Sequence, residues 1–163
     1  MSAESPAPPS VFYRAQHRRS FTHYDSQYGF EAQGRYLMDY SHWINKQKIE
    51  SHLNRNARPL EPTPFISVFD NRASANSRAQ IFRNRGYRDV FIAEIRPGGL
   101  ECTSLPLRFF EGVVDLPAWI APEGTIFLSS ADLRRYLHVD VAISDRHEWL
   151  AIEWIPASMI RVI

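Results

Sequence analysis

The chain has 163 residues, of which 44% are hydrophobic and 13% aromatic, and its formal net charge is +1. This length favours one domain, and the apolar content excludes a wholly disordered chain. The balanced charge gives no bulk attraction to nucleic acid or anionic membranes. The single cysteine, Cys102, excludes an internal disulfide and a cysteine-based zinc site, and it is compatible with a reducing compartment. We therefore expect a cytoplasmic protein.

The first ten residues, MSAESPAPPS, lack a basic segment followed by an apolar run, so we expect no secretory signal there. Their Pro, Ser and Ala content predicts a flexible lead over residues 1–10, followed by a single domain over 11–163. No window approaches the roughly 18 apolar residues that a membrane-spanning helix needs. We accordingly expect no membrane partner.

The N-terminal part of the domain combines a strand, a loop and a helix. VFYRAQ, 11–16, predicts a short strand, whereas 18–30 is polar and aromatic without a clear period and predicts an ordered loop. Residues 41–55 predict a helix with Ser41 as its N-cap. Two prolines, Pro59 and Pro62, then mark a connection.

The centre of the chain predicts a strand, a helix and a second strand. TPFISVFD, 63–70, is a strand, and Asp70 can cap a helix over 71–86 that ends at Gly86. DVFIAEIRPGG, 89–99, is the next strand, closed by Pro-Gly.

Strands dominate the remaining chain. We expect strands over 107–117 and 124–130, a short helix over 130–137 capped by Ser129 or Ser130, and a last strand within RHEWLAIEWIP, 146–156. Residues 157–163 finish the chain. Because the strands do not alternate regularly with helices, the pattern predicts an α+β fold.

Three polar residues stand where strands would be expected to carry apolar ones: Arg14, Ser67 and Glu148. Each also has a structural explanation. Arg14 can cover apolar surface at a sheet edge, Ser67 can bond a neighbouring backbone group, and Glu148 can face solvent. With strict alternation, Glu148 and Glu153 fall on opposite faces of the last strand. Since a buried carboxylate is costly unless it is paired or used, the position of these glutamates bears on function.

Several familiar motifs are absent from the sequence. Ser67 has no G-x-S-x-G context, the six histidines show no metal-binding spacing, and no glycine-rich phosphate loop occurs. The arginines of RNRGYR, 83–88, complement a helix C-terminus, which we favour over RNA contact. We expect no metal and no nucleic-acid partner.

The order of FYRAQ, TPFISVFD and HEWLAIEWIP resembles the arginine–serine–glutamate class of ADP-ribosyltransferases. More closely, FYR, an HLN before TPFISVF, and EWLAIEWIP together resemble a domain of unknown function common in fungal proteins, itself similar to ADP-ribosyltransferases. The resemblance implies an α+β fold with split β-sheets that form an NAD cleft and helices on the outside.

The resemblance also implies roles for particular residues. Arg14 would hold the phosphates and ribose of NAD, Ser67 would position the glutamate and bind the nicotinamide ribose, and Glu148 would be catalytic. Phe69 or Phe82 would form an aromatic wall for nicotinamide. NAD would be the substrate, and the acceptor would be a macromolecule, in our expectation a protein.

The sequence departs from that class at two points. Ser67-Val68-Phe69 stands where many members have Ser-Thr-Ser, and Arg146 stands where members carry an acceptor-selecting Glu or Gln. Arg146 would either recruit an acidic or phosphate-bearing acceptor or pair with Glu148 and keep it inert. Three alternatives therefore stay open: transfer to an acceptor, hydrolysis of NAD, and a catalytically inactive interaction module.

Overall fold

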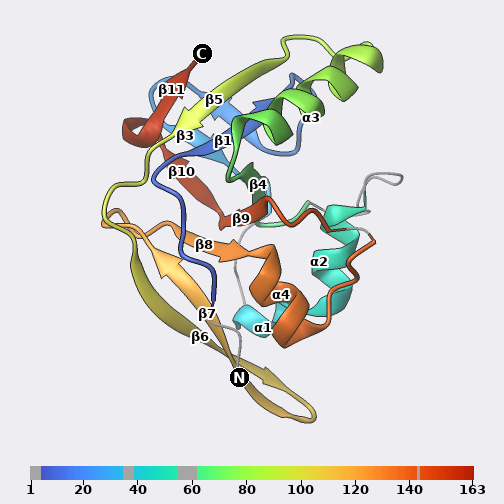
Figure 1. Cartoon of the computed structure of the whole chain (residues 1–163), viewed down its shortest axis with the longest axis vertical. Coiled ribbons are helices and arrows are strands. Elements are labelled where there is room, and N and C mark those ends of the chain that lie inside the picture. Colours follow the sequence, from blue (N-terminus) through green and yellow to red (C-terminus); the bar gives the residue numbers. More distant parts are fainter. Residues whose placement is uncertain (1–4, 35–38, 55–61, 143) are drawn as a thin grey trace.

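The computed structural model describes residues 5–34, 39–54, 62–142 and 144–163. Figure 1 shows a strongly curved sheet with helices packed beside it. Eight strands form the main sheet, in the order β11-β5-β1-β4-β9-β8-β7-β6, and three form a second sheet, β10-β3-β2. Every pairing among the described strands is antiparallel. The predicted α+β class is confirmed.

The bounds of the elements follow. The strands are β1 Phe12–Gln16, β2 His23–Asp25, β3 Gly29–Glu31, β4 Phe65–Phe69, β5 Phe91–Ile95, β6 Glu101–Phe109, β7 Gly112–Ile120, β8 Ile126–Ser129, β9 Glu148–Ile152, β10 Trp154–Pro156 and β11 Ile160–Val162. The helices are α1 Tyr40–Trp43, α2 Lys46–Leu53, α3 Arg72–Asn84, α4 Ser130–Leu137 and a 3-10 turn over Ala157–Met159.

The predicted strands at 11–16, 63–70 and 124–130 correspond to β1, β4 and β8, and the strand within 89–99 is β5. The helix at 130–137 is α4, and the Ser129 side chain caps it by accepting a hydrogen bond from the backbone N–H of Asp132. The helix at 71–86 is α3. Its cap is Asn71, not Asp70: Oδ1 of Asn71 accepts from the N–H of Ser74 at 2.8 Å.

Three predictions of local structure were wrong. The loop over 18–30 contains β2 and β3. The described part of the helix predicted over 41–55 is two helices, because Asn45 is extended and begins α2; their N-cap residues are Asp39 and Asn45, not Ser41, and residue 55 lies outside the described residues. The strand over 107–117 is the end of β6, a turn and the start of β7, a hairpin that projects from the body in Figure 1.

The last predicted strand is divided at Glu153, whose φ of 64° lies in the left-handed region. β9 before it belongs to the main sheet, and β10 after it belongs to the three-stranded sheet. The Glu153 N–H donates to the carbonyl of Pro64, and its own carbonyl accepts from the N–H of Ala32, both at 2.7 Å. Strict alternation across 146–156 is therefore wrong, because the chain changes sheets at this residue.

Both faces of the main sheet are covered. One cluster packs α1, α2 and α4 against the strands through Trp43, Ile49, Leu133 and Leu150, among others. On the other face, Phe12, Phe127 and Trp149 form one cluster with Phe30 of the three-stranded sheet. A smaller cluster fixes α3 over β1, β4 and β5. All five residues of β9 are buried as a result.

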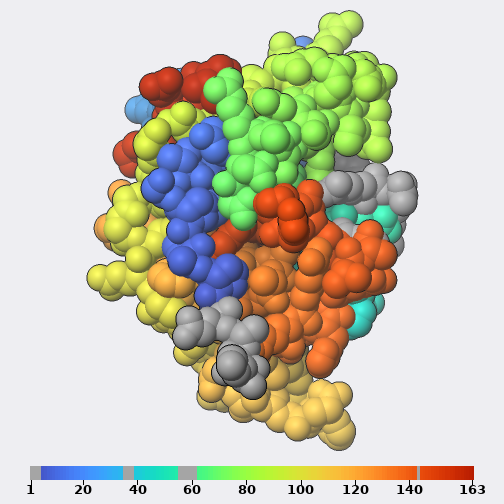
Figure 2. Space-filling model, in the orientation of Figure 1, coloured from blue at the N-terminus to red at the C-terminus, as the bar shows by residue number. Residues whose placement is uncertain are grey.

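The chain before β1 lies along the body of the protein. From residue 5 it runs without regular secondary structure across the face shown in Figures 1 and 2. Oγ of Ser5 donates to Oδ1 of Asp132 in α4 at 2.8 Å. The flexible lead was predicted over residues 1–10, and residues 1–4 lie outside the described residues.

Candidate functional site

A pocket of ≈ 460 Å³ opens beside the point where β1 and β4 separate. Among the described residues, these strands are joined by one register pair, Tyr13–Phe69, whereas β4 and β9 share five. Ala15 and Ser67, which would form the next pair on the same face, both line the pocket instead. A fork between two strands therefore creates the cavity within an otherwise continuous sheet.

The pocket brings together the polar residues that the sequence singled out. Arg14 of β1, Ser67 of β4 and Glu148 of β9 all line it, and so does Phe69. The three strands are consecutive in the sheet, which explains how residues far apart in sequence meet. Ser67 and Glu148 lie on the α3 face, while Arg14 shares its strand face with Phe12 and reaches the pocket at the fork.

The Arg14 guanidinium is buried and held at several points, and the residue is only 7% exposed. Its Nε and Nη2 both donate to Oε1 of Gln16, at 3.0 and 2.7 Å, Nη2 also donates to Oγ of Ser20, and Nη1 donates to the carbonyl of Ser67 at 2.8 Å. These bonds use four of the five N–H groups of a guanidinium. Burial, together with the nearby charge of Arg78, lowers the pKa of Arg14 to about 9. It remains protonated at neutral pH, and its chief role is to tie β1 to β4.

Ser67 contacts a histidine to which the sequence analysis gave no role. His52, in the last turn of α2, lies with Nε2 3.0 Å from Oγ of Ser67 and Nδ1 2.6 Å from Oγ1 of Thr63. Burial, and next the charges of Arg14 and Arg78, lower the pKa of His52 to about 3. A neutral imidazole therefore links the two hydroxyls, and it is a poor base for activating Ser67 as a nucleophile.

The suppressed pKa of His52 predicts an acid-sensitive fold. An unfolded histidine takes up a proton near pH 6.5, while the folded ring resists it until about pH 3. As the pH falls through this window, the unfolded state binds the extra proton, so the free energy of unfolding decreases by up to about 1.4 kcal/mol per pH unit. Urea denaturation at several pH values should show a shallower slope for His52→Gln, and equal slopes would contradict this account.

Glu148 begins β9 and is 2% exposed, so the alternative of a solvent-facing glutamate is wrong. Oε1 of Glu148 lies 3.9 Å from Nη2 of Arg78, an ion pair longer than a hydrogen bond. The Arg78 guanidinium also lies over the Phe69 ring, 5.3 Å from its centroid, and the Arg78 side chain is 17% exposed. Arg78 thus joins the glutamate, the aromatic ring and the pocket.

Arg146 lies apart from the lining of the pocket described above. It is exposed, and its Nε donates to Nε2 of His147 at 3.2 Å. Since that ring nitrogen accepts, Nδ1 of His147 carries the proton and donates to Oδ1 of Asp70 at 2.8 Å. The arginine placed to modulate Glu148 inside the pocket is therefore Arg78.

Three aromatic rings of the pocket lining contact one another, and we call them the aromatic rim: His17, Phe82 and Tyr87. The His17 ring stacks on Tyr87 with 4.5 Å between centroids and meets the Phe82 ring edge-on at 4.5 Å. Phe82, one of the two candidates for a nicotinamide wall, therefore belongs to the rim. Phe69, the other candidate, lies deeper and is almost fully buried.

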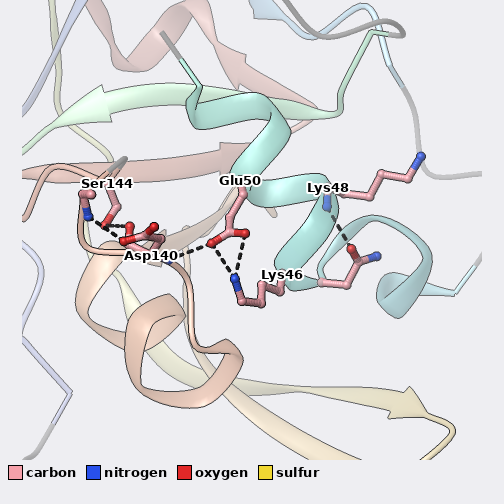
Figure 3. A network of polar contacts seen from close by, with 7 residues as sticks. Lys46, Lys48, Glu50, Asp140 and Ser144 are labelled. Carbon is pink, nitrogen blue, oxygen red and sulfur yellow. Dashed lines mark hydrogen bonds and ion pairs between the residues drawn. The ribbon is translucent and has the colours of Figure 1, made fainter. Parts of the chain in front are cut away.

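The helix that carries His52 is secured by a polar network (Figure 3). Nζ of Lys46 bonds both carboxylate oxygens of Glu50 at 2.8 Å, and the N–H of Asp140 donates to Oε2 of Glu50 at 2.8 Å. The hydrogen bond from Lys46 is the main reason that the pKa of Glu50 is lowered. The ion pair is largely exposed and contributes little by itself. The bond to Asp140 connects α2 to the chain after α4.

Two further properties bear on the kind of site. Within the described ranges, no group of three or more His, Cys, Asp or Glu side chains is arranged to hold a metal ion. No helix in the described part of the chain is long and apolar enough to cross a membrane.

Comparison with known families finds a match. Residues 7–162 match the model of a family described as a domain of unknown function, DUF7587. No curated protein and no solved structure matches the chain.

Proposed function

The chain belongs to the DUF7587 family of unknown function, and we propose that it is an NAD-dependent ADP-ribosyltransferase. It would cleave the nicotinamide–ribose bond of NAD and transfer ADP-ribose to a macromolecular acceptor or to water. The observation that carries the proposal is the meeting of Arg14, Ser67 and Glu148 in one pocket, from three adjacent strands. These are the residues expected from the resemblance of the sequence to that class of enzymes.

Glu148 is the residue proposed to promote bond cleavage. As the C–N bond breaks, its electron pair leaves with nicotinamide, and positive charge develops on the ribose. A fixed carboxylate stabilises that charge and can accept a hydrogen bond from the ribose hydroxyl. The acceptor, or water, then bonds to the anomeric carbon and loses a proton. Ser67, held by His52, would orient the ribose and the glutamate.

We divide the role that the resemblance gives to Arg14, holding the NAD phosphates, between two arginines. Arg14 donates four of its five N–H groups to Gln16, Ser20 and the Ser67 carbonyl, so its main effect is to shape the site and not to bind ligand. Arg78 lines the same pocket from α3 and is partly exposed there. We therefore assign the main contact with the NAD phosphates to Arg78, because a planar guanidinium suits a diphosphate.

A second candidate function is a catalytically inactive module that retained the pocket and binds a protein partner. The observation that favours it is the burial of Glu148 together with its ion pair to Arg78, which would hold the carboxylate away from a substrate. The active enzyme requires this long ion pair to open when NAD enters. An inactive module would keep it closed.

The test is direct. Purified protein incubated with millimolar NAD is expected to release nicotinamide and to melt at a higher temperature. At a hundredfold excess over Kd, a ligand adds about 2.7 kcal/mol to the free energy of unfolding, which in a chain of this size raises Tm by several degrees. Ligand-induced stabilisation without nicotinamide release would favour the inactive module. Absence of both would remove NAD from consideration.

A further inference from the structure

The aromatic rim is only partly explained by internal packing. Phe82 lies against the cluster beneath α3, and the backbone N–H of Tyr87 bonds the carbonyl of Phe82 at 3.0 Å, which holds the chain after the helix. Tyr87 is nevertheless 37% exposed, and Ile81, another residue of the pocket lining, is exposed to the same extent. A stacked His17–Tyr87 pair thus presents a partly open aromatic surface to the pocket.

Arginines accompany the rim. Arg19 and Arg85 line the same pocket as the rim, and Arg78 lines it beside Glu148. Arg78 and Arg85 are seven residues apart, so their Cα atoms are separated by about 10 Å, two turns along the helix. Along α3, away from Arg78 and Glu148, the pocket lining therefore reaches a second guanidinium, that of Arg85, in the same segment as Phe82 and Tyr87 of the rim.

This arrangement matches a ligand with an anionic middle and a planar heterocycle at its far end. We infer that the aromatic rim binds the adenine base of the dinucleotide, with Arg78 near the diphosphate and Arg85 attracting the phosphate next to the adenosine. The inference rests on the proposed function, which places the nicotinamide end at Glu148. Bases of every kind stack on aromatic side chains, and removal of one stacking partner typically weakens binding about ten- to a hundredfold.

The experiment compares two nucleotides that share one end or the other of NAD. The full chain is titrated calorimetrically with AMP and with nicotinamide mononucleotide. We expect Tyr87→Ala to lower the affinity for AMP about ten- to a hundredfold and to leave the affinity for nicotinamide mononucleotide unchanged. Tyr87→Phe should restore AMP binding, because it keeps the ring. The matched control is Tyr28→Ala, which removes an exposed tyrosine of the turn between β2 and β3.

The outcomes separate this inference from the proposed function. If NAD is cleaved, and Tyr87→Ala binds AMP as tightly as the native chain, the rim is not the adenine site, although the proposed cleavage of NAD is correct. If AMP binds through Tyr87 while NAD is never cleaved, the rim is an adenine site but the proposed transferase activity is wrong. Equal weakening of both mononucleotides would reduce Tyr87 to a structural role. A further outcome would overturn the inference: the chain binds a single-stranded oligonucleotide tightly and in a salt-dependent way, and Tyr87→Ala abolishes this binding without changing the affinity for AMP. The ligand of the rim would then be a polynucleotide and not the adenine of NAD.

Discussion

Glu148→Gln is expected to slow nicotinamide release from NAD about a hundredfold to a thousandfold, the usual cost of removing one preorganised electrostatic group. Glutamine keeps the shape of the side chain and its hydrogen-bonding oxygen, but it removes the negative charge that would face the developing positive charge on the ribose. The measurement is the rate of nicotinamide release at saturating NAD. NAD-induced stabilisation, followed by Tm, should persist, because the proposed phosphate contact belongs to Arg78.

The matched control is Glu153→Gln, on the same segment. Glu153 occupies the left-handed position between β9 and β10, and Glu148 is the one of the two that lines the pocket. We expect its nicotinamide release to equal that of the native chain. Because Glu148→Gln also removes the partner of Arg78, Glu148→Asp is a second variant that retains the charge and should keep part of the activity. A native rate in Glu148→Gln would overturn the catalytic assignment.

The fold could be predicted where local pattern and tertiary environment agree. FYRAQ and FISVF are strands, and Ser129 caps α4 as its sequence indicates. The β6–β7 hairpin was missed because its turn begins with Phe110, an apolar residue that is fully exposed, and only Gly112 carries a turn signal, at a φ of 142°. The break at Glu153 has no local signal, since a left-handed glutamate is specified by its two backbone hydrogen bonds to distant segments.

The site was predictable for residues that interrupt apolar strands and not for residues on helices. Arg14, Ser67 and Glu148 stand out among apolar neighbours, and the resemblance to a known class supplied the roles proposed for them. His52 and Arg78 are polar residues on amphipathic helices, where such side chains are ordinary. Their importance comes from the packing of α2 and α3 beside the fork, which no local period reveals. Arg146 drew attention by its sequence position, although the ion pair with Glu148 is made by Arg78.

The second large effect concerns stability. Arg14→Met is expected to lower the free energy of unfolding by about 3 kcal/mol, because it leaves the Ser67 carbonyl and Oε1 of Gln16 without a buried donor. Methionine fills much of the space of the arginine stem, so lost packing should contribute little. Relief of repulsion with Arg78 opposes the loss, but it does not restore the hydrogen bonds. Urea denaturation measures the change.

Arg78→Met is the comparison that separates shaping the pocket from binding the ligand. Arg78 is partly exposed at the pocket, and its ion pair with Glu148 is long, so its removal should cost less stability than that of Arg14. It should nevertheless abolish the rise in Tm that NAD produces. If Arg14→Met proves too unstable to purify, Arg14→Lys retains the charge but not the planar fork of donors, and it should show an intermediate loss of stability. The reverse result, in which Arg14→Met is as stable as the native chain and loses NAD binding while Arg78→Met retains it, would return the phosphate contact to Arg14. The fork between β1 and β4 would then have to be maintained by other contacts, because the guanidinium would be a ligand group and not a tie between the strands.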